Sequence, residues 1–284
     1  MAALTRLPTM DPGAVLATEE LEIDLLLEAV FQRHGFDFRA FDRAGLRRKL
    51  HALMHAHGLD TVSMLQNAIL HQAGMSSELL RALSVQPAPL FDDPEQARLL
   101  RIMLACLHAS PVPKVWLPDC AGPEAAWSLA ILLAEEQLHR RTEIYATLPS
   151  EEAVSDAARA SIPVERMEEY QEAYLKSGGM ANLADYFVIK GKRATLTPRL
   201  QSRITWAQYN VVTDASPNEF QMIICGRALP DYGPVLRARV LQLFHDSLAL
   251  FGVIGIDRVM EQGDPLYAYY QPMFANEPWY KRIA

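Results

Sequence analysis

The chain has 284 residues, and 50% of them are hydrophobic, which is enough to bury a large core in one domain or two. Its net charge of -7 arises without a dense Lys/Arg block, which argues against a surface for nucleic acid or anionic membranes. No apolar run approaches the roughly 18 residues of a membrane span. The first residues lack a secretory apolar stretch, so we expect a cytoplasmic protein without membrane insertion.

The cysteines and histidines form no recognisable metal or disulfide pattern. Cys106, Cys120 and Cys225 are far apart in the chain, which favours buried free thiols in a reducing compartment. His51 and His55 have helical spacing, but no HExxH pattern accompanies them. We therefore predict a solvated helix face there and no metal site.

The first part of the chain has the periodicity of amphipathic helices. Helices are predicted over residues 19–33, 42–54, 61–73 and 76–83. Residues 84–96 then contain three prolines and no periodicity, as expected of a connecting segment. These patterns predict an N-terminal helical domain over residues 1–84 and a second domain over residues 85–284.

The second domain alternates short apolar runs with helical patterns. The runs that predict strands are 114–119, 142–148, 203–211, 219–227 and 250–257. The helical patterns are 126–140, 151–160 and 235–250. This alternation is typical of βαβ units and predicts a parallel sheet.

A segment over about residues 163–203 interrupts that alternation. A helix is predicted over 164–178, ended by Gly178 and Gly179, and a hairpin over 188–196 turns at Gly191. The segment is therefore predicted to be an inserted subdomain.

Four stretches of the chain resemble the CheR-type methyltransferases, which transfer a methyl group from S-adenosylmethionine to glutamate side chains of chemoreceptors. The stretches are residues 80–96, 115–135, 162–187 and 204–252. The resemblance implies an α/β fold, in which an N-terminal helical domain precedes a Rossmann-like class I methyltransferase domain with a small inserted β-subdomain. Function has to be argued from the site, because one fold serves many activities.

The first strand-to-helix turn departs from the family. It reads DCAGPEA where the family has approximately GCSTGEE, so Asp119 and Pro123 replace two glycines. Proline fixes φ and lacks an N–H, which makes close approach of a ligand to this backbone harder. Gly122 can restore flexibility one residue earlier, and Pro123 suits the first position of a helix.

Three further segments also depart from the family. Leu148 stands where an acid would accept hydrogen bonds from ribose, although Glu151 or Glu152 could substitute for it. Asp92 replaces an arginine in the segment before the methyltransferase domain, which reverses the charge there. The remaining differences are Gln86 for Asn, Ala88 for Thr or Ser, and Asp231 for Tyr, with Arg227 and Tyr232 offset by one residue.

Two positions keep residues that match cofactor contacts of the family. These are Glu124 and Asn210, which we interpret as vestigial cofactor-binding residues. Glu124 could instead be a favourable acid in the first turn of a helix, and Asn210 a turn residue at a strand end. No catalytic residue is identified.

The losses at separated segments favour a non-catalytic CheR-like protein that acts as a binding or regulatory module in chemosensory-type signalling. No cofactor is then expected. The resemblance implies that the inserted subdomain, roughly residues 181–197, is a docking surface for a protein partner such as a chemoreceptor or signalling protein. Lys190, Lys192 and Arg193 would suit an acidic peptide, or would simply keep a strand edge soluble.

Two alternatives remain at this stage. The chain could be an active S-adenosylmethionine-dependent protein-glutamate O-methyltransferase with a rearranged pocket, in which Glu124, Asn210 and Arg227 hold the cofactor, since methyl transfer depends mostly on alignment. The altered crevice could also bind a different small ligand.

Overall fold

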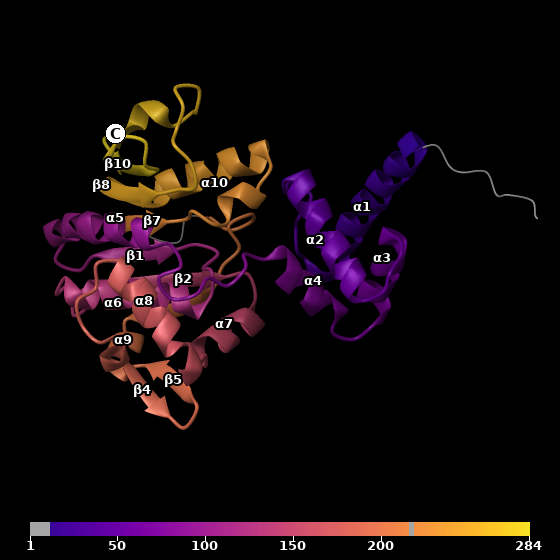
Figure 1. Ribbon diagram of the computed structural model, residues 1–284. Coiled ribbons are helices and arrows are strands. Elements are labelled where there is room, and N and C mark those ends of the chain that lie inside the picture. Colours follow the sequence, from indigo (N-terminus) through magenta and orange to yellow (C-terminus); the bar gives the residue numbers. More distant parts are fainter. Residues whose placement is uncertain (1–11, 216–218) are drawn as a thin grey trace, which may run out of the picture. The chain divides into compact units, whose positions relative to one another are not determined.

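The structure, a computed structural model, describes residues 12–215 and 219–284. Residues 1–11, part of the stretch considered above for a secretory signal, lie outside the described residues. The chain divides between Leu83 and Ser84 into two compact units, which are described separately (Figure 1). No helix of the described residues is long and apolar enough to cross a membrane.

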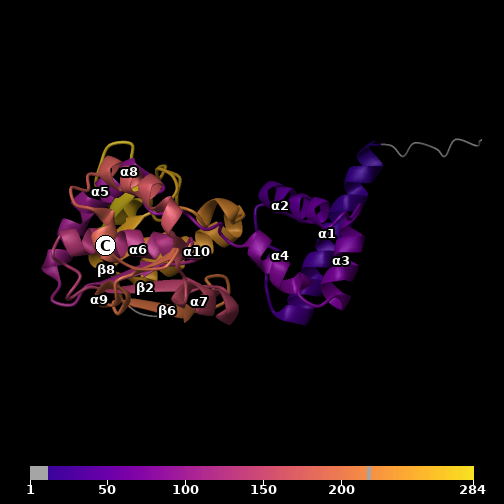
Figure 2. The ribbon, with the colours of Figure 1, turned by 60° about the horizontal axis from the view of Figure 1, so that its bottom comes forward.

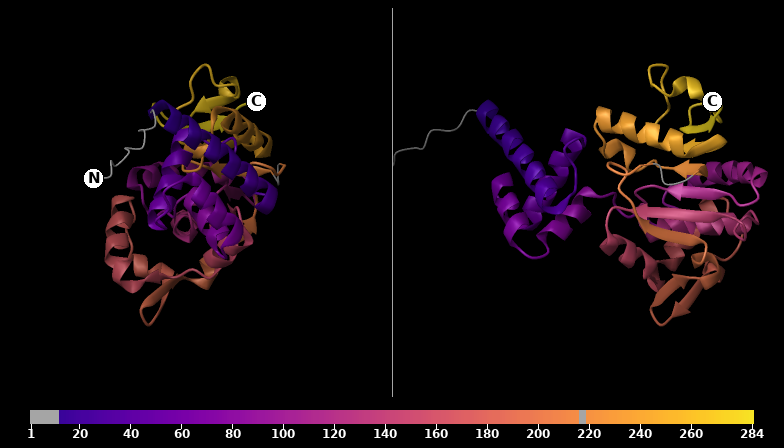
Figure 3. Two further views of the ribbon diagram at one scale, coloured as in Figure 1. Left: turned by 90° about the vertical axis from the view of Figure 1, so that its right-hand side faces the viewer. Right: turned by 180° about the vertical axis from the view of Figure 1, so that it is seen from behind.

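The first unit consists of helices that pack around one apolar core (Figure 3). They are α1 (Pro12–His34), α2 (Arg43–Ala56), α3 (Val62–His71) and α4 (Met75–Leu83). Leu26, Leu50 and Leu65 are fully buried in this core. Asp42 caps α2 by accepting a hydrogen bond of 2.7 Å from the Gly45 N–H, which satisfies one unpaired donor of the first turn. The helices predicted from the sequence are therefore present, and α1 begins earlier than its periodicity indicated.

The second unit is built on a seven-stranded sheet in the order β6-β2-β1-β7-β8-β10-β9. The strands are β1 (Lys114–Leu117), β2 (Glu143–Leu148), β6 (Ile204–Gln208), β7 (Phe220–Ile224), β8 (Leu248–Gly255), β9 (Tyr270–Pro272) and β10 (Trp279–Arg282). The first five strands in the sheet order pair in parallel, and β10 pairs antiparallel with both β8 and β9. This arrangement confirms the predicted α/β class and the mainly parallel sheet.

Helices connect and cover these strands. They are α5 (Pro94–Leu104), α6 (Pro123–Glu135), α7 (Glu151–Ala158) and α10 (Pro234–Ser247), with the short α9 (Pro198–Gln201). Helix α7 packs beside β2 and β6 (Figure 2).

Several predicted boundaries were wrong. The connecting segment was extended to residue 96, but α5 begins at Pro94, where Asp93 accepts hydrogen bonds of 3.1 Å from the Glu95 and Gln96 N–H groups. The helix predicted to reach residue 250 ends at Ser247, because Leu248 is buried and pairs with Phe220 in the sheet. The antiparallel strands β9 and β10 were not predicted.

The insertion contains α8 (Met167–Lys176) and a three-stranded sheet in the order β3-β5-β4. Its strands are β3 (Ile162–Pro163), β4 (Phe187–Lys190) and β5 (Arg193–Leu196), at the bottom of the view in Figure 1. The predicted hairpin is present, with Gly191 at a φ of 59° in the turn. Helix α8 ends at Lys176, just before the two glycines predicted to terminate it: Gly178 has a φ of 84°, and the Gly179 N–H donates a hydrogen bond of 3.0 Å to the Tyr174 carbonyl.

Candidate functional site

The β1–α6 turn lies at the carboxyl end of β1, the middle one of the five parallel strands, where α/β folds place their ligands. Asp119 has a φ of 43°, so it adopts the left-handed conformation that usually favours glycine. Gly122 has a φ of 81°, and a Cβ added there would lie 3.2 Å from Cβ of Pro87. Helix α6 begins at Pro123, as predicted. The turn is therefore well formed with the residues it has.

The segment before α5 is bound to this turn. The Ala88 N–H donates a hydrogen bond of 2.9 Å to the Ala121 carbonyl. The Phe91 N–H donates one of 3.0 Å to Oγ of Ser128 in α6. Pro87, next in the chain to Ala88, packs against Gly122, so this segment forms one side of the site.

Asp119 is the central charged group of the turn. Its carboxylate accepts a hydrogen bond from the hydroxyl of Tyr232, which precedes α10. Burial raises the pKa of Asp119 to about 6, and the nearby Asp231 adds to that increase, while the Tyr232 hydrogen bond opposes it. No arginine, lysine or histidine of the described residues forms a salt bridge with Asp119. The turn therefore holds a carboxylate with a neutral partner and no counter-charge.

Asp92 and Arg227, both singled out in the sequence, form an ion pair with each other. Asp92 belongs to the segment before α5, and Arg227 follows β7. Arg227 was considered a remnant of the family site. Its partner is Asp92, the residue that replaces an arginine of the family.

The end of β2 presents an apolar side chain. Leu148 is 8% exposed and belongs to the hydrophobic core of this unit. Glu151 and Glu152, considered as substitutes, lie in the first turn of α7 with exposed side chains. Among the described residues, the last position of β2 therefore offers no carboxylate to a ribose.

The two predicted cofactor-binding residues take part in internal hydrogen bonds. Both carboxylate oxygens of Glu124 lie 3.1 Å from the hydroxyl of Tyr170 in α8, and burial raises the pKa of Glu124. Oδ1 of Asn210 accepts a hydrogen bond of 2.9 Å from the Val212 N–H, a local turn typical of asparagine. Neither residue lines the cavity described next.

A cavity of about 470 Å³ opens at the carboxyl ends of β1, β7 and β8, between α5 and α6. Its walls are mostly apolar, formed by Phe91, Leu100, Leu117, Leu129, Leu132 and Trp279. Its charged lining residues are Asp92, Asp93, Asp119, Arg227 and Asp257. The volume and the apolar walls with a few polar groups are typical of small-molecule sites.

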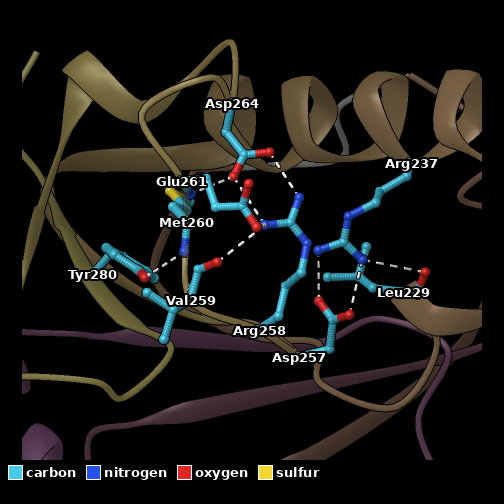
Figure 4. A network of polar contacts seen from close by, with 9 residues as sticks. All are labelled: Leu229, Arg237, Asp257, Arg258, Val259, Met260, Glu261, Asp264 and Tyr280. Atoms are coloured by element: carbon cyan, nitrogen blue, oxygen red, sulfur yellow. Dashed lines mark hydrogen bonds and ion pairs between the residues drawn. The ribbon is translucent and has the colours of Figure 1, made fainter.

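A polar network fixes the Asp257 wall of this cavity (Figure 4). Arg237 of α10 binds Asp257 through two hydrogen bonds, of 2.9 and 2.7 Å, and donates a third of 3.3 Å to the Leu229 carbonyl. In the same loop Arg258 binds Asp264 at 3.0 and 2.8 Å. These residues were not predicted from the sequence, because they pair only once β8 is in place and no local pattern in the chain indicates such a pair.

Both units match known families in sequence. Residues 21–84 match the family described as "CheR methyltransferase, all-alpha domain". Residues 91–261 match "CheR methyltransferase, SAM binding domain". A Pseudomonas putida protein named "Putative methyltransferase Cher3" is 35% identical over 237 residues, which cover 83% of this chain and 86% of that protein. A "Chemotaxis protein methyltransferase" of Listeria innocua is 25% identical over 154 residues, 53% of this chain and 56% of that protein.

Two solved structures that match part of this chain are methyltransferases of low sequence identity. The N-methyltransferase NodS of Bradyrhizobium japonicum, in complex with S-adenosylhomocysteine, is 13% identical with a TM-score of 0.32, over 59% of this chain and 62% of that one. The glycopeptide N-methyltransferase MtfA with S-adenosylmethionine is 11% identical with a TM-score of 0.36, over 67% of this chain and 66% of that one.

Proposed function

This chain belongs to the CheR methyltransferase family, and from that premise we propose that it is a non-catalytic member. It acts as a binding or regulatory module and does not use S-adenosylmethionine. The family relationship supplies the fold, whereas the proposal rests on the residues at the carboxyl ends of the strands.

The observation that carries the proposal is the buried Leu148 at the end of β2. In this kind of fold an acidic side chain at that point binds the ribose hydroxyls of a nucleotide-like cofactor. A lost charge-assisted hydrogen bond weakens binding by about 1.5–3 kcal/mol, or roughly 10- to 150-fold. Leucine accepts no hydrogen bond, so the ribose would lose these contacts.

The β1–α6 turn adds to this argument. Pro123 has no N–H to offer a ligand, and Asp119, where the family has glycine, lines the cavity beside this turn. The Asp92–Arg227 pair neutralises an arginine that would otherwise be available to a substrate carboxylate. These residues do not fit the cofactor of the family.

Isothermal titration calorimetry tests the proposal. The folded full-length chain is titrated with S-adenosylmethionine and with S-adenosylhomocysteine, and we expect no heat of binding at millimolar ligand. Leu148→Asp tests the observation that carries the proposal, because it places a carboxylate at the end of β2. Leu16→Asp, the same change at an exposed position of α1, is its control. Micromolar binding to the unchanged chain would overturn the proposal and restore the alternative of an active methyltransferase with a rearranged pocket.

We propose further that a protein partner docks on the inserted sheet. Strand β4 is one of its two outer strands, with an exposed Ile189 and Lys190, and an extended peptide can add to such an edge. Arg193, in the middle strand β5, donates a hydrogen bond of 2.8 Å to Oγ of Ser161 within the insertion. A neutral hydroxyl leaves Arg193 charged, so Arg193 adds to the positive charge that Lys190 and Lys192 present to an acidic partner.

Fluorescence anisotropy with a labelled acidic peptide of extended conformation measures this docking. Lys192→Glu should weaken binding, because it places a like charge beside the peptide. Lys176→Glu makes the same charge change at the end of α8 and should leave binding unchanged. Equal effects of both variants would show that only net charge matters and would contradict docking at β4.

A further inference from the structure

We propose that the cavity at the carboxyl ends of β1, β7 and β8 binds a small organic cation, a primary ammonium group with an apolar tail, through the carboxylate of Asp119. The inference rests on the proposed function, because a cavity that held S-adenosylmethionine would already contain a cation.

The charges around the cavity point to Asp119 as the group that requires a ligand. Asp92 is paired with Arg227, and Asp257 is held by two hydrogen bonds from Arg237. The Asp93 carboxylate caps α5 and accepts two backbone hydrogen bonds there. Asp119 differs from these three, since its partner is the neutral hydroxyl of Tyr232.

A carboxylate in such a place is stabilised by a cation. Burial disfavours the ionised form, and a hydroxyl group offsets that penalty only in part. The pKa of Asp119, about 6, leaves the group largely ionised at neutral pH. A positively charged ligand beside it would restore the missing counter-charge.

The walls of the cavity determine the rest of the ligand. Leu117, Leu129 and Leu132 are buried, and Trp279 and Phe91 add aromatic surface. Apolar walls favour a hydrocarbon or aromatic tail over a sugar or a phosphate. The four carboxylates and the single arginine of the lining disfavour an anion. An amine with an aromatic or aliphatic tail fits both properties.

Calorimetry with three probes of similar shape tests this inference in the full-length protein. Phenethylamine carries the ammonium group, 2-phenylethanol is neutral, and phenylacetate is an anion. At pH 7.5 we expect phenethylamine to bind at least about tenfold more tightly than the other two, as for a charge-assisted hydrogen bond.

Two variants locate the binding. Asp119→Asn removes the charge and keeps the shape of the side chain, so it should weaken phenethylamine binding by about tenfold or more. Asp156→Asn makes the same change at an exposed position of α7 that does not line the cavity, so binding should stay unchanged. Circular dichroism verifies that both variants are folded.

The outcomes separate the two proposals. Absence of phenethylamine binding, equal binding of the alcohol, or equal effects of the two variants would each overturn the inference. Titration with S-adenosylmethionine is a separate measurement. Its binding would overturn the proposed function, whereas the Asp119→Asn result would still decide whether this carboxylate binds an organic cation.

Discussion

Asp119 combines an unusual backbone conformation with an unusual electrostatic environment. Its φ of 43° is one that aspartate and asparagine tolerate better than most residues with a Cβ. Asp119 lines a cavity, and none of the cationic side chains that the structure describes pairs with its carboxylate. Both properties can be examined by replacing the carboxylate with an amide.

We predict that Asp119→Asn stabilises the protein in a pH-dependent manner. The folded-state pKa of about 6 exceeds the ordinary value of 3.8, so the folded state binds this proton more tightly than the unfolded state. The wild type therefore loses stability as the pH rises from about 4 to about 6, by at most about 3 kcal/mol, and the variant does not. Urea unfolding at pH 4.5, 6 and 7.5 should show a growing difference in the free energy of unfolding.

Asp264→Asn is the matched control and should have the opposite sign. Hydrogen bonds from Arg258 lower the pKa of Asp264, so its stabilising contribution is present at neutral pH and is lost as the pH falls through the folded-state pKa. This variant should be less stable than the wild type at pH 7.5, with a smaller difference at acid pH. A difference independent of pH for Asp119→Asn would contradict the role of burial.

Gly179 is required for packing at the end of α8. A Cβ added there would lie 2.2 Å from the ring of Tyr174, a buried residue whose hydroxyl bonds to Glu135 and accepts the Ala181 N–H at 3.2 Å. The ring therefore cannot move away without losing these bonds.

Gly179→Ala should lower the free energy of unfolding by about 1–3 kcal/mol or more, the usual range for overpacking. Gly263→Ala is the control, because no atom lies within 4 Å of its added Cβ. Chemical denaturation measures both variants. Equal stability of the two would show that the Tyr174 ring adjusts freely.

At the scale of elements, the loop after β8 depends on charged pairs rather than on regular structure. Arg237 and Asp257 have side chains that are only 14% and 12% exposed, and they join α10 to the end of β8. The Tyr280 hydroxyl of β10 accepts a hydrogen bond of 2.6 Å from the Met260 N–H, which fixes the same loop (Figure 4). The wall of the cavity is therefore set by contacts among three elements.

Arg237→Met should lower the free energy of unfolding by about 3–5 kcal/mol, since it leaves Asp257 buried without its partner. Arg98→Met breaks a pair whose side chains are 51% and 76% exposed, and should change stability by about 0–1 kcal/mol. Thermal unfolding compares the two. If Arg237→Met lowered the free energy of unfolding as little as Arg98→Met does, water would have to replace Arg237 around Asp257.

At the scale of the whole molecule, the two units have separate hydrophobic cores. One core is formed only by residues between Ile23 and Leu83, and the other only by residues between Leu90 and Trp279. Among the residues that the structure describes, neither core contains one from the other unit, which is the usual condition for independent folding.

The fragment of residues 84–284 should therefore fold by itself. We expect a single cooperative thermal transition, with a midpoint within about 5 °C of the corresponding transition in the full chain. Differential scanning calorimetry of the fragment and of the whole protein makes this comparison. A fragment without a cooperative transition would show that residues 1–83 are needed to complete its core.

The sequence alone determined the class of fold, because alternating apolar runs and amphipathic patterns are local properties of the chain. It located the helices of the first unit and all five parallel strands, and its resemblance to the CheR family is confirmed. It also identified Asp119, Pro123 and Leu148 as departures from the family. That these three lie near the carboxyl ends of adjacent strands follows from the strand order.

Only the tertiary structure decided which side chains meet. Asp119 and Tyr232 are 113 positions apart, and Arg237 and Asp257 are 20 apart, so no periodic pattern connects them. The antiparallel β9 and β10 were missed for a related reason, since short strands at the end of a chain are specified by the partner they pair with. Glu124 and Asn210 matched the family in sequence, and in the structure the Glu124 carboxylate accepts a hydrogen bond from Tyr170 and the Asn210 side chain accepts one from the Val212 N–H. Local sequence fixes the elements, whereas charge pairing and the cavity arise only when the sheet brings the strand ends together.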